Sequence, residues 1–179
     1  YFRGAAPEKR ASGLTHIDTI LVLTLPGDNH TWSVTVFGSA GDQLLKALRH
    51  EDKWTAVVRA CPLHAHWLDG ESITGVLPMA GIVDRYRRFV VDNQPVVTGF
   101  VPLADAWACT NPSAGRGLAV GFLHAREVRD ALREAGDDPE TIVRRVDERT
   151  ESTVSPWYHA QIAVDRMRFA QMNAIREGR

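Results

Sequence analysis

The chain has 179 residues, of which 44% are hydrophobic and 24% charged, with a formal net charge of −1. These values are ordinary for a globular protein of one domain or two small lobes, and the near-neutral charge gives no basic field for binding nucleic acid. No apolar run approaches the roughly 20 residues that span a bilayer, and Cys61 and Cys109 are too few for a disulfide framework, so a cytoplasmic location is expected.

The chain begins Tyr1-Phe2-Arg3-Gly4, with no initiator Met and no signal-peptide pattern, so we expect a piece of a longer product. Residues 17–25 and 31–37 are rich in β-forming residues and flank the strong turn sequence Pro26-Gly27-Asp28-Asn29, which predicts a hairpin. Apolar residues at alternate positions of the second run predict one buried face: Trp32, Val34 and Val36.

Two helices are expected next, because residues 42–50 and 51–60 carry apolar side chains at helical spacing. Pro62 ends the second of them.

Strand character returns over residues 73–77 and 86–91. The turn sequence Asp92-Asn93-Gln94-Pro95 then leads into residues 96–103, which are apolar at almost every position. Such a run is typical of a strand buried on both faces of a layered sheet.

The remaining third of the chain predicts helices. The first follows Gly117 and carries a stripe that we expect to pack against the sheet: Leu118, Gly121, Ala125, Val128 and Leu132. Residues 136–139 end it, a second helix covers residues 141–149, and Ser155 opens a third. On this last helix four residues align: Tyr158, Ile162, Phe169 and Met172. The fold class is therefore α+β or α/β, with an antiparallel sheet, a buried strand and C-terminal helices.

Asp105 stands just after the predicted buried strand. A carboxylate there is desolvated on one side, and the hydroxyl groups of a bound sugar-like chain would satisfy it. Asp also commonly accepts hydrogen bonds from nearby backbone amides, so a role in bracing the loop stands equally open.

The loop that follows reads Asn-Pro-Ser-Ala-Gly-Arg-Gly over residues 111–117. Pro112 stiffens it, while Gly115 and Gly117 permit backbone conformations or close approaches that a side chain would block. The helix after it directs free N–H groups and the positive end of its dipole outward, an arrangement suited to an electron-rich ring. An ordinary turn is the alternative interpretation.

Residues 101–117 resemble the second flavin-binding motif of FAD-dependent oxidoreductases, a group that includes aromatic hydroxylases, geranylgeranyl reductases and flavin-dependent halogenases. That motif runs Gly-Asp-Ala, several residues, Pro-x-x-Gly-x-Gly, then a helix. The resemblance implies that Asp105 binds the ribityl chain of FAD. It also implies that the loop lies beside the pyrimidine edge of the isoalloxazine, with four cofactor-binding residues: Pro112, Gly115, Arg116 and Gly117.

Two features depart from the family pattern. Ala104 stands where the motif has Gly, and the chain has no Gly-x-Gly-x-x-Gly, which in the family binds the adenosine diphosphate part of FAD. The resemblance therefore implies an incomplete FAD/NAD(P)-binding fold, with residues 1–95 as a substrate-domain-like sheet with helices. Residues 96–179 would be the C-terminal part of the FAD-binding domain with a helical tail. Alone, this chain should bind FAD weakly or not at all.

The implied activity is that of a monooxygenase or reductase in the full-length enzyme, with NAD(P)H or another electron donor and an apolar small-molecule substrate. No side chain is assigned to a catalytic step. The alternative is a non-catalytic ligand-binding or interaction domain derived from this fold, and a homodimer that exchanges elements is also open.

Other chemistry-bearing residues favour structural roles. Cys61, His64 and His66 have the residue types of a metal site but lack a fourth ligand, so no metal is expected. The basic stretch 84–89 is expected to be a solvated strand face, with a contact to an FAD phosphate as the alternative. Further residues are expected in packing roles, or lack the partners of a catalytic triad: Cys109, Trp107, Trp157, Tyr158, His124 and His159.

Overall fold

The computed structural model describes residues 1–39 and 41–178. These residues form two compact units, one from Tyr1–Ala80 with Phe169–Arg179 and the other from Gly81–Arg168. The division predicted between residues 95 and 96 differs from these units and stays a prediction. Within the described part of the chain, no helix is both long enough and apolar enough to cross a membrane.

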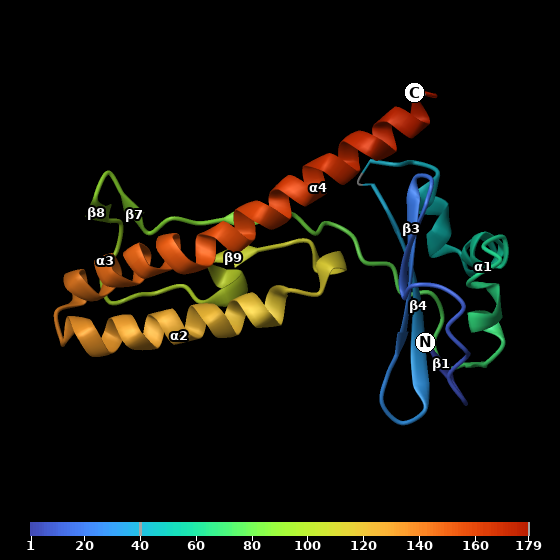
Figure 1. The fold of residues 1–179 in the computed structure, drawn as a ribbon, viewed down its shortest axis with the longest axis horizontal. Helices are drawn as coiled ribbons and strands as arrows, with labels where there is room; N and C mark the ends of the chain where they lie inside the picture. The colour runs from blue at the N-terminus through green and yellow to red at the C-terminus, as the bar shows by residue number, and fades with distance from the viewer. Residues whose placement is uncertain (40, 179) are drawn as a thin grey trace. The chain divides into compact units, whose positions relative to one another are not determined.

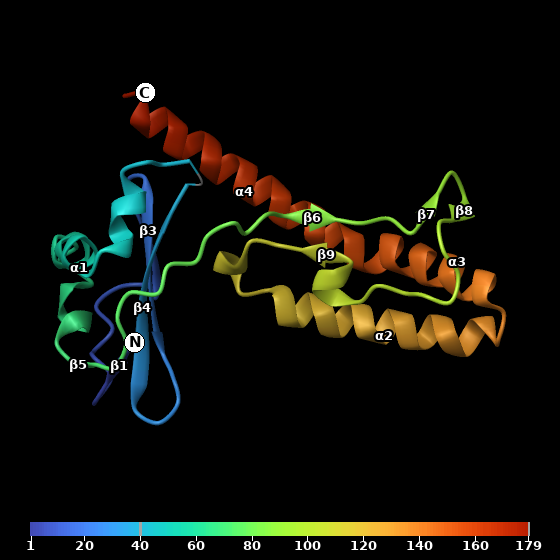
Figure 2. The ribbon, with the colours of Figure 1, turned by 180° about the vertical axis from the view of Figure 1, so that it is seen from behind.

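The first unit is built on an antiparallel five-stranded sheet with strand order β2-β3-β4-β1-β5 (Figures 1 and 2). Its strands are β1 (Phe2–Arg3), β2 (Leu14–Ile17), β3 (Ile20–Pro26), β4 (Thr31–Gly38) and β5 (Glu71–Ser72). The predicted hairpin is confirmed as β3–β4, which pair from Ile20 opposite Gly38 to Pro26 opposite Trp32. Ile17 belongs to β2, because the chain turns at Asp18, whose φ is 49°.

The core of the first unit gathers around Trp32, which is 2% exposed. Its indole N–H donates to the Trp67 carbonyl at 2.9 Å, and its ring stacks on Phe2 at 5.8 Å between centroids. Gly70 is needed here, since a Cβ at that position would lie 2.3 Å from the indole. The predicted alternation of β4 is confirmed, because Val34 is also buried and Val36 packs against the same core.

One of the two helices expected in the first unit forms in full. It is α1 (Glu51–Arg59), which lies beside the sheet (Figure 1). Its Val58 belongs to the core. Over residues 42–50 only the short 3-10 helix η1 (Leu45–Arg49) forms. The strand predicted over residues 73–77 is wrong, because β5 ends at Ser72.

The second unit contains the C-terminal helices that the sequence predicts. They are α2 (Gly117–Ala135), α3 (Pro139–Arg149) and α4 (Ser155–Arg176), whose residues up to Arg168 belong to this unit. A π-helical turn that the sequence did not predict, η5 (Thr150–Val154), joins α3 to α4. The helix α2 packs against α3 and η5. The carboxylate of Asp138 accepts the Thr141 N–H at 2.8 Å and begins α3 with Pro139 in its first turn.

The buried face of α2 differs from the predicted apolar stripe. Leu118 and Leu132 are 78% and 46% exposed, whereas His124, Glu127 and Ala131 are buried. The spacing of apolar residues does not reveal this buried face, because His124 and Glu127 on it are polar. Their burial is tolerated because each has partners, which for Glu127 are Arg126 at 2.9 Å and Arg149 at 3.2 Å.

The buried strand predicted over residues 96–103 is wrong. The segment forms no strand, and Val96 and Phe100 are 66% and 53% exposed. Gly99, with φ at 74°, breaks the extended backbone, and Pro102 lacks an N–H for pairing.

The predicted strand 86–91 forms as two short strands, β6 (Arg85–Tyr86) and β7 (Val90–Val91). They pair with β9 (Ala108–Cys109) and β8 (Gln94–Pro95), respectively. The expected turn between β7 and β8 is present at Asp92 and Asn93, whose positive φ values are those of a two-residue hairpin turn.

Candidate functional site

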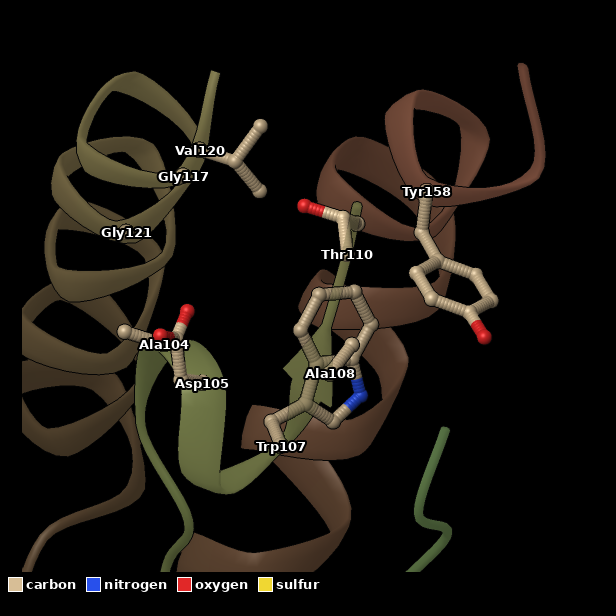
Figure 3. Close-up of a pocket in the computed structure, with 9 residues that line it drawn as sticks. All are labelled: Ala104, Asp105, Trp107, Ala108, Thr110, Gly117, Val120, Gly121 and Tyr158. Atoms are coloured by element: carbon tan, nitrogen blue, oxygen red, sulfur yellow. The ribbon is translucent and has the colours of Figure 1, made fainter. Parts of the chain in front are cut away.

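Asp105 and Gly117 line the same small hollow in the second unit (Figure 3). The hollow lies between the first turns of α2, the short 3-10 helix η3 (Ala104–Ala106) and Tyr158 of α4. Its volume is about 10 Å³, room for about one water molecule. Trp107 and Val120 also line it.

The backbone reverses sharply just before Asp105. Ala104 has a φ of 51°, the left-handed region, which costs an L-residue with a side chain roughly 1–2 kcal/mol. Two groups hold this turn. Arg87 donates to the carbonyls of Ala106 at 3.0 Å and Asp105 at 3.4 Å, and the Ala104 N–H donates to Nδ1 of His124 at 3.2 Å.

The Asp105 carboxylate is left available by this turn. Asp105 is exposed, and η3 has no side-chain cap. Among the described residues no donor reaches its carboxylate, so Asp105 does not brace the loop as a cap. Figure 3 shows the carboxylate pointing toward the space between α2 and Thr110. An exposed anionic acceptor beside a helix start can bind hydroxyl groups of a ligand.

The loop between Asp105 and α2 is ordered by its own hydrogen bonds. The Asn111 side chain accepts the Ser113 N–H at 3.0 Å and donates to Asp165 at 3.3 Å. A 3-10 turn, η4 (Pro112–Ala114), follows and ends at Gly115, whose φ is 65°. This left-handed position favours glycine, so the loop uses Gly115 for its backbone conformation.

The N-terminus of α2 has no side-chain cap and no acidic residue in its first turn. Its first intrahelical hydrogen bond runs from the Val120 N–H to the Arg116 carbonyl. The N–H groups of Gly117, Leu118 and Ala119 therefore lack intrahelical acceptors, and they stand at the positive end of the helix dipole. Such an end stabilises negative charge on a ligand.

The predicted site residues are therefore only partly gathered at one place. Asp105 and Gly117 share the hollow. Pro112, Gly115 and Arg116 lie in the exposed loop that leads to α2 and do not line it. A Cβ added at Gly117 would meet nothing within 4 Å, so the space beside this glycine is open for a close approach.

Arg87 and Arg88 of the basic stretch 84–89 form hydrogen bonds or ion pairs within the second unit. Arg88 forms a bidentate ion pair with Asp147, at 3.1 and 2.8 Å, and a longer one with Glu151 at 3.4 Å. The hydrogen bond with Asp147 raises the pKa of Arg88. Because Arg87 also holds η3, the interpretation of these two arginines as contacts to an FAD phosphate is not supported.

Trp107 and Tyr158, which line the hollow, belong to a cluster of aromatic rings with Tyr86. Tyr86 lies 5.5 Å from Trp107 and 5.0 Å from Tyr158, between ring centroids. Its hydroxyl donates to Glu151 and is 3.1 Å from the Ser155 hydroxyl. Burial, together with the Glu151 hydrogen bond, raises the pKa of Tyr86 to about 12, so the phenol stays protonated and structural. Trp107 and Tyr158 are buried as expected, whereas Trp157 is exposed.

Two residues of the considered metal site in the first unit, Cys61 and His66, form other contacts. The Cys61 thiol donates to the Val57 carbonyl at 3.3 Å, and Nε2 of His66 is 2.8 Å from the Glu8 carbonyl oxygen. Burial, followed by the neighbouring His66, lowers the pKa of His64. Within residues 1–39 and 41–178, no three His, Cys, Asp or Glu side chains are grouped to bind a metal.

Sequence reasoning missed His124 as a part of the site. The sequence feature that could have indicated His124 is its spacing. It stands four residues after Val120 and seven after Gly117, which puts all three near one face of α2.

Comparisons with protein-family models, curated proteins and solved structures return no match. The resemblance to FAD-dependent oxidoreductases therefore rests on the motif residues alone.

Proposed function

We propose that this chain supplies the flavin-facing part of an FAD-dependent oxidoreductase, a monooxygenase or a reductase. The observation that carries the proposal is the left-handed turn at Ala104, after which an unpaired Asp105 lines the same hollow as the uncapped start of α2. In the motif that residues 101–117 resemble, glycine occupies the position of Ala104. Glycine favours the left-handed conformation that Ala104 adopts here.

The residues fit two parts of the cofactor. The Asp105 carboxylate suits the ribityl hydroxyls, and the free amides at the start of α2 suit the electron-rich pyrimidine edge. The hollow, at about 10 Å³, is far smaller than the roughly 300 Å³ of a small ligand pocket. The flavin would therefore lie against the exposed side of Asp105 and the loop, rather than inside the hollow.

When bound, FAD supplies the redox chemistry, and the protein supplies orientation and electrostatics. Asp105 would orient the ribityl chain by accepting hydrogen bonds, and the amides of Gly117 and Leu118 would stabilise negative charge on the ring. An apolar small molecule is the proposed substrate of the complete enzyme, with NAD(P)H or another electron donor.

A second candidate is a non-catalytic ligand-binding or interaction domain of the same origin. The exposed apolar segment 96–103 favours it, because apolar side chains left in water commonly mark a surface that another molecule covers. This candidate predicts no dependence of flavin binding on Asp105.

The proposal is tested with riboflavin, which contains the ring and the ribityl chain but no adenosine diphosphate. Quenching of riboflavin fluorescence is titrated with the wild-type chain and with Asp105→Ala. Removing the carboxylate should weaken binding at least about tenfold, because hydrogen bonds to a charged group contribute roughly 1.5–3 kcal/mol. Asp137→Ala is the matched control, since Asp137 is exposed in the connection between α2 and α3.

Equal riboflavin affinity for wild type, Asp105→Ala and Asp137→Ala would contradict the assigned role of Asp105. No quenching at about 1 mM protein, a concentration that detects interactions near −4 kcal/mol, by this chain and also by a chain extended at its N-terminus would contradict the flavin proposal itself.

A further inference from the structure

His124 lies at the centre of the turn that presents Asp105, although the motif does not include it. Its imidazole is 1% exposed and projects from the buried face of α2. Nδ1 accepts the Ala104 N–H at 3.2 Å, and Nε2 is 3.1 Å from the Thr150 hydroxyl of η5. The Trp107 ring packs edge-on at 4.8 Å between centroids.

These contacts fix the protonation state of the ring. A backbone N–H can only donate, so Nδ1 must carry a free lone pair. The proton of the neutral imidazole is then on Nε2, which donates to the Thr150 hydroxyl. Burial lowers the pKa of His124, which favours this neutral form. His124 is thus a fixed acceptor aimed at one backbone amide.

The amide that donates to His124 belongs to Ala104, the residue in the left-handed conformation. Ala104 has a φ of 51°, and its conformation sets the direction in which Asp105 leaves the turn. A left-handed alanine persists only where its surroundings over-determine it. The surroundings here are His124 on the N–H side, Arg87 on the carbonyls of the next two residues, and Gly121, whose missing side chain leaves room for Ala104.

We infer that His124 is a positioning residue, whose Nδ1 holds Ala104 in the left-handed conformation and thereby aims the Asp105 carboxylate toward the start of α2. Its consequence for flavin rests on the proposed function. Its consequence for the turn does not, because the contact joins two groups of this chain and can be measured without any ligand.

The test compares two substitutions of nearly equal shape. In His124→Asn the side-chain oxygen can replace Nδ1 as an acceptor, whereas in His124→Leu no acceptor remains. Both variants lose the imidazole packing on Trp107 to a similar extent. If His124 only fills space in the core, His124→Leu should be at least as stable as His124→Asn. If His124 positions Ala104, only His124→Asn should keep the hydrogen bond to the Ala104 N–H.

Three measurements are made on the full chain. The ¹⁵N chemical shifts of His124 in wild type report its tautomer and should show Nδ1 unprotonated. Hydrogen exchange of the Ala104 amide should be about tenfold faster in His124→Leu than in His124→Asn, as expected for one hydrogen bond. Riboflavin affinity should fall in the leucine variant and recover in the asparagine variant. His16→Asn, at an exposed histidine of β2 in the first unit, is the control and should change none of the three.

A protonated Nδ1 in wild type, or equal Ala104 exchange in the two variants, overturns the inference. If His124→Leu does not fold, the tautomer and the comparison of wild type with His124→Asn still decide it. If neither wild type nor a chain extended at its N-terminus binds riboflavin while Ala104 exchange behaves as stated, the proposed function fails and the positioning role stands.

Discussion

At the scale of single residues, the site depends on an alanine in a conformation that favours glycine. Ala104 has a φ of 51° and immediately precedes the unpaired Asp105. The presence of Ala104 in place of the motif glycine could be read from the sequence, but its left-handed conformation could not. It arises from His124, Arg87 and Gly121, which the fold brings to the turn from other segments.

Substitutions at Ala104 should test its left-handed conformation. In Ala104→Gly the relief of strain and the greater freedom of the unfolded chain offset each other, so the free energy of unfolding should stay within about 1 kcal/mol of wild type. Ala104→Val should lose at least about 1 kcal/mol, because a β-branched residue strongly disfavours a positive φ. Urea unfolding measures both values, and a valine variant as stable as wild type would refute the left-handed turn.

The buried histidines should make the protein sensitive to acid. Burial lowers the pKa values of His124 and His64 below the roughly 6.5 of an unfolded histidine. As the pH falls, the unfolded state therefore binds protons first, and the free energy of unfolding decreases. Urea unfolding at about pH 7 and about pH 5 should show this loss, and it should be smaller in His124→Asn, which removes one such group. If the free energy of unfolding of His124→Asn decreases by as much as that of wild type, His124 does not contribute to the acid sensitivity.

At the scale of elements, the helices were more predictable than their faces or the strands. The turn residues Gly136 and Pro139 locate the boundary between α2 and α3, and local chemistry of this kind is readable from sequence. The buried face of α2 was not readable, because His124 and Glu127 are buried through partners on other elements. The segment 96–103 failed for a related reason, since a strand requires a pairing partner and apolar composition does not supply one.

The packing of α2 on the turn gives a test at this scale. A Cβ at Gly121 would lie 3.2 Å from the Cβ of Ala104, so Gly121→Leu should overpack the contact and lower the free energy of unfolding by about 1–3 kcal/mol. Gly117→Ala is the matched control on the same helix, because a Cβ there meets nothing within 4 Å. This control should be neutral or more stable by up to about 1 kcal/mol, since alanine favours a helix over glycine. Equal effects of the two substitutions would disprove the close approach.

At the scale of the whole molecule, the described chain consists of two compact units, each with its own buried core. The candidate site lies entirely within the second unit, so its local geometry can be tested without reference to the first. The sequence contains no Gly-x-Gly-x-x-Gly, the motif that would bind adenosine diphosphate.

This chain should therefore distinguish poorly between flavins. FAD and riboflavin should bind with affinities within about fivefold of each other, because a difference of less than about 1 kcal/mol is expected where no group holds the extra phosphates. Flavin fluorescence titrations with both ligands measure the ratio, and a chain extended at its N-terminus offers a comparison. Markedly tighter binding of FAD by this chain would show a phosphate site that the motif does not predict.

The most direct test of the central claim is to map riboflavin contacts by amide chemical shifts in ¹⁵N–¹H spectra of this chain. Riboflavin should shift the amides of Asp105, Gly115, Gly117 and Leu118, and the same additions to Asp105→Ala should shift them far less. Shifts absent from these residues, or centred on the sheet of the first unit instead, would contradict the assignment of Asp105 and the start of α2 as the flavin-facing site.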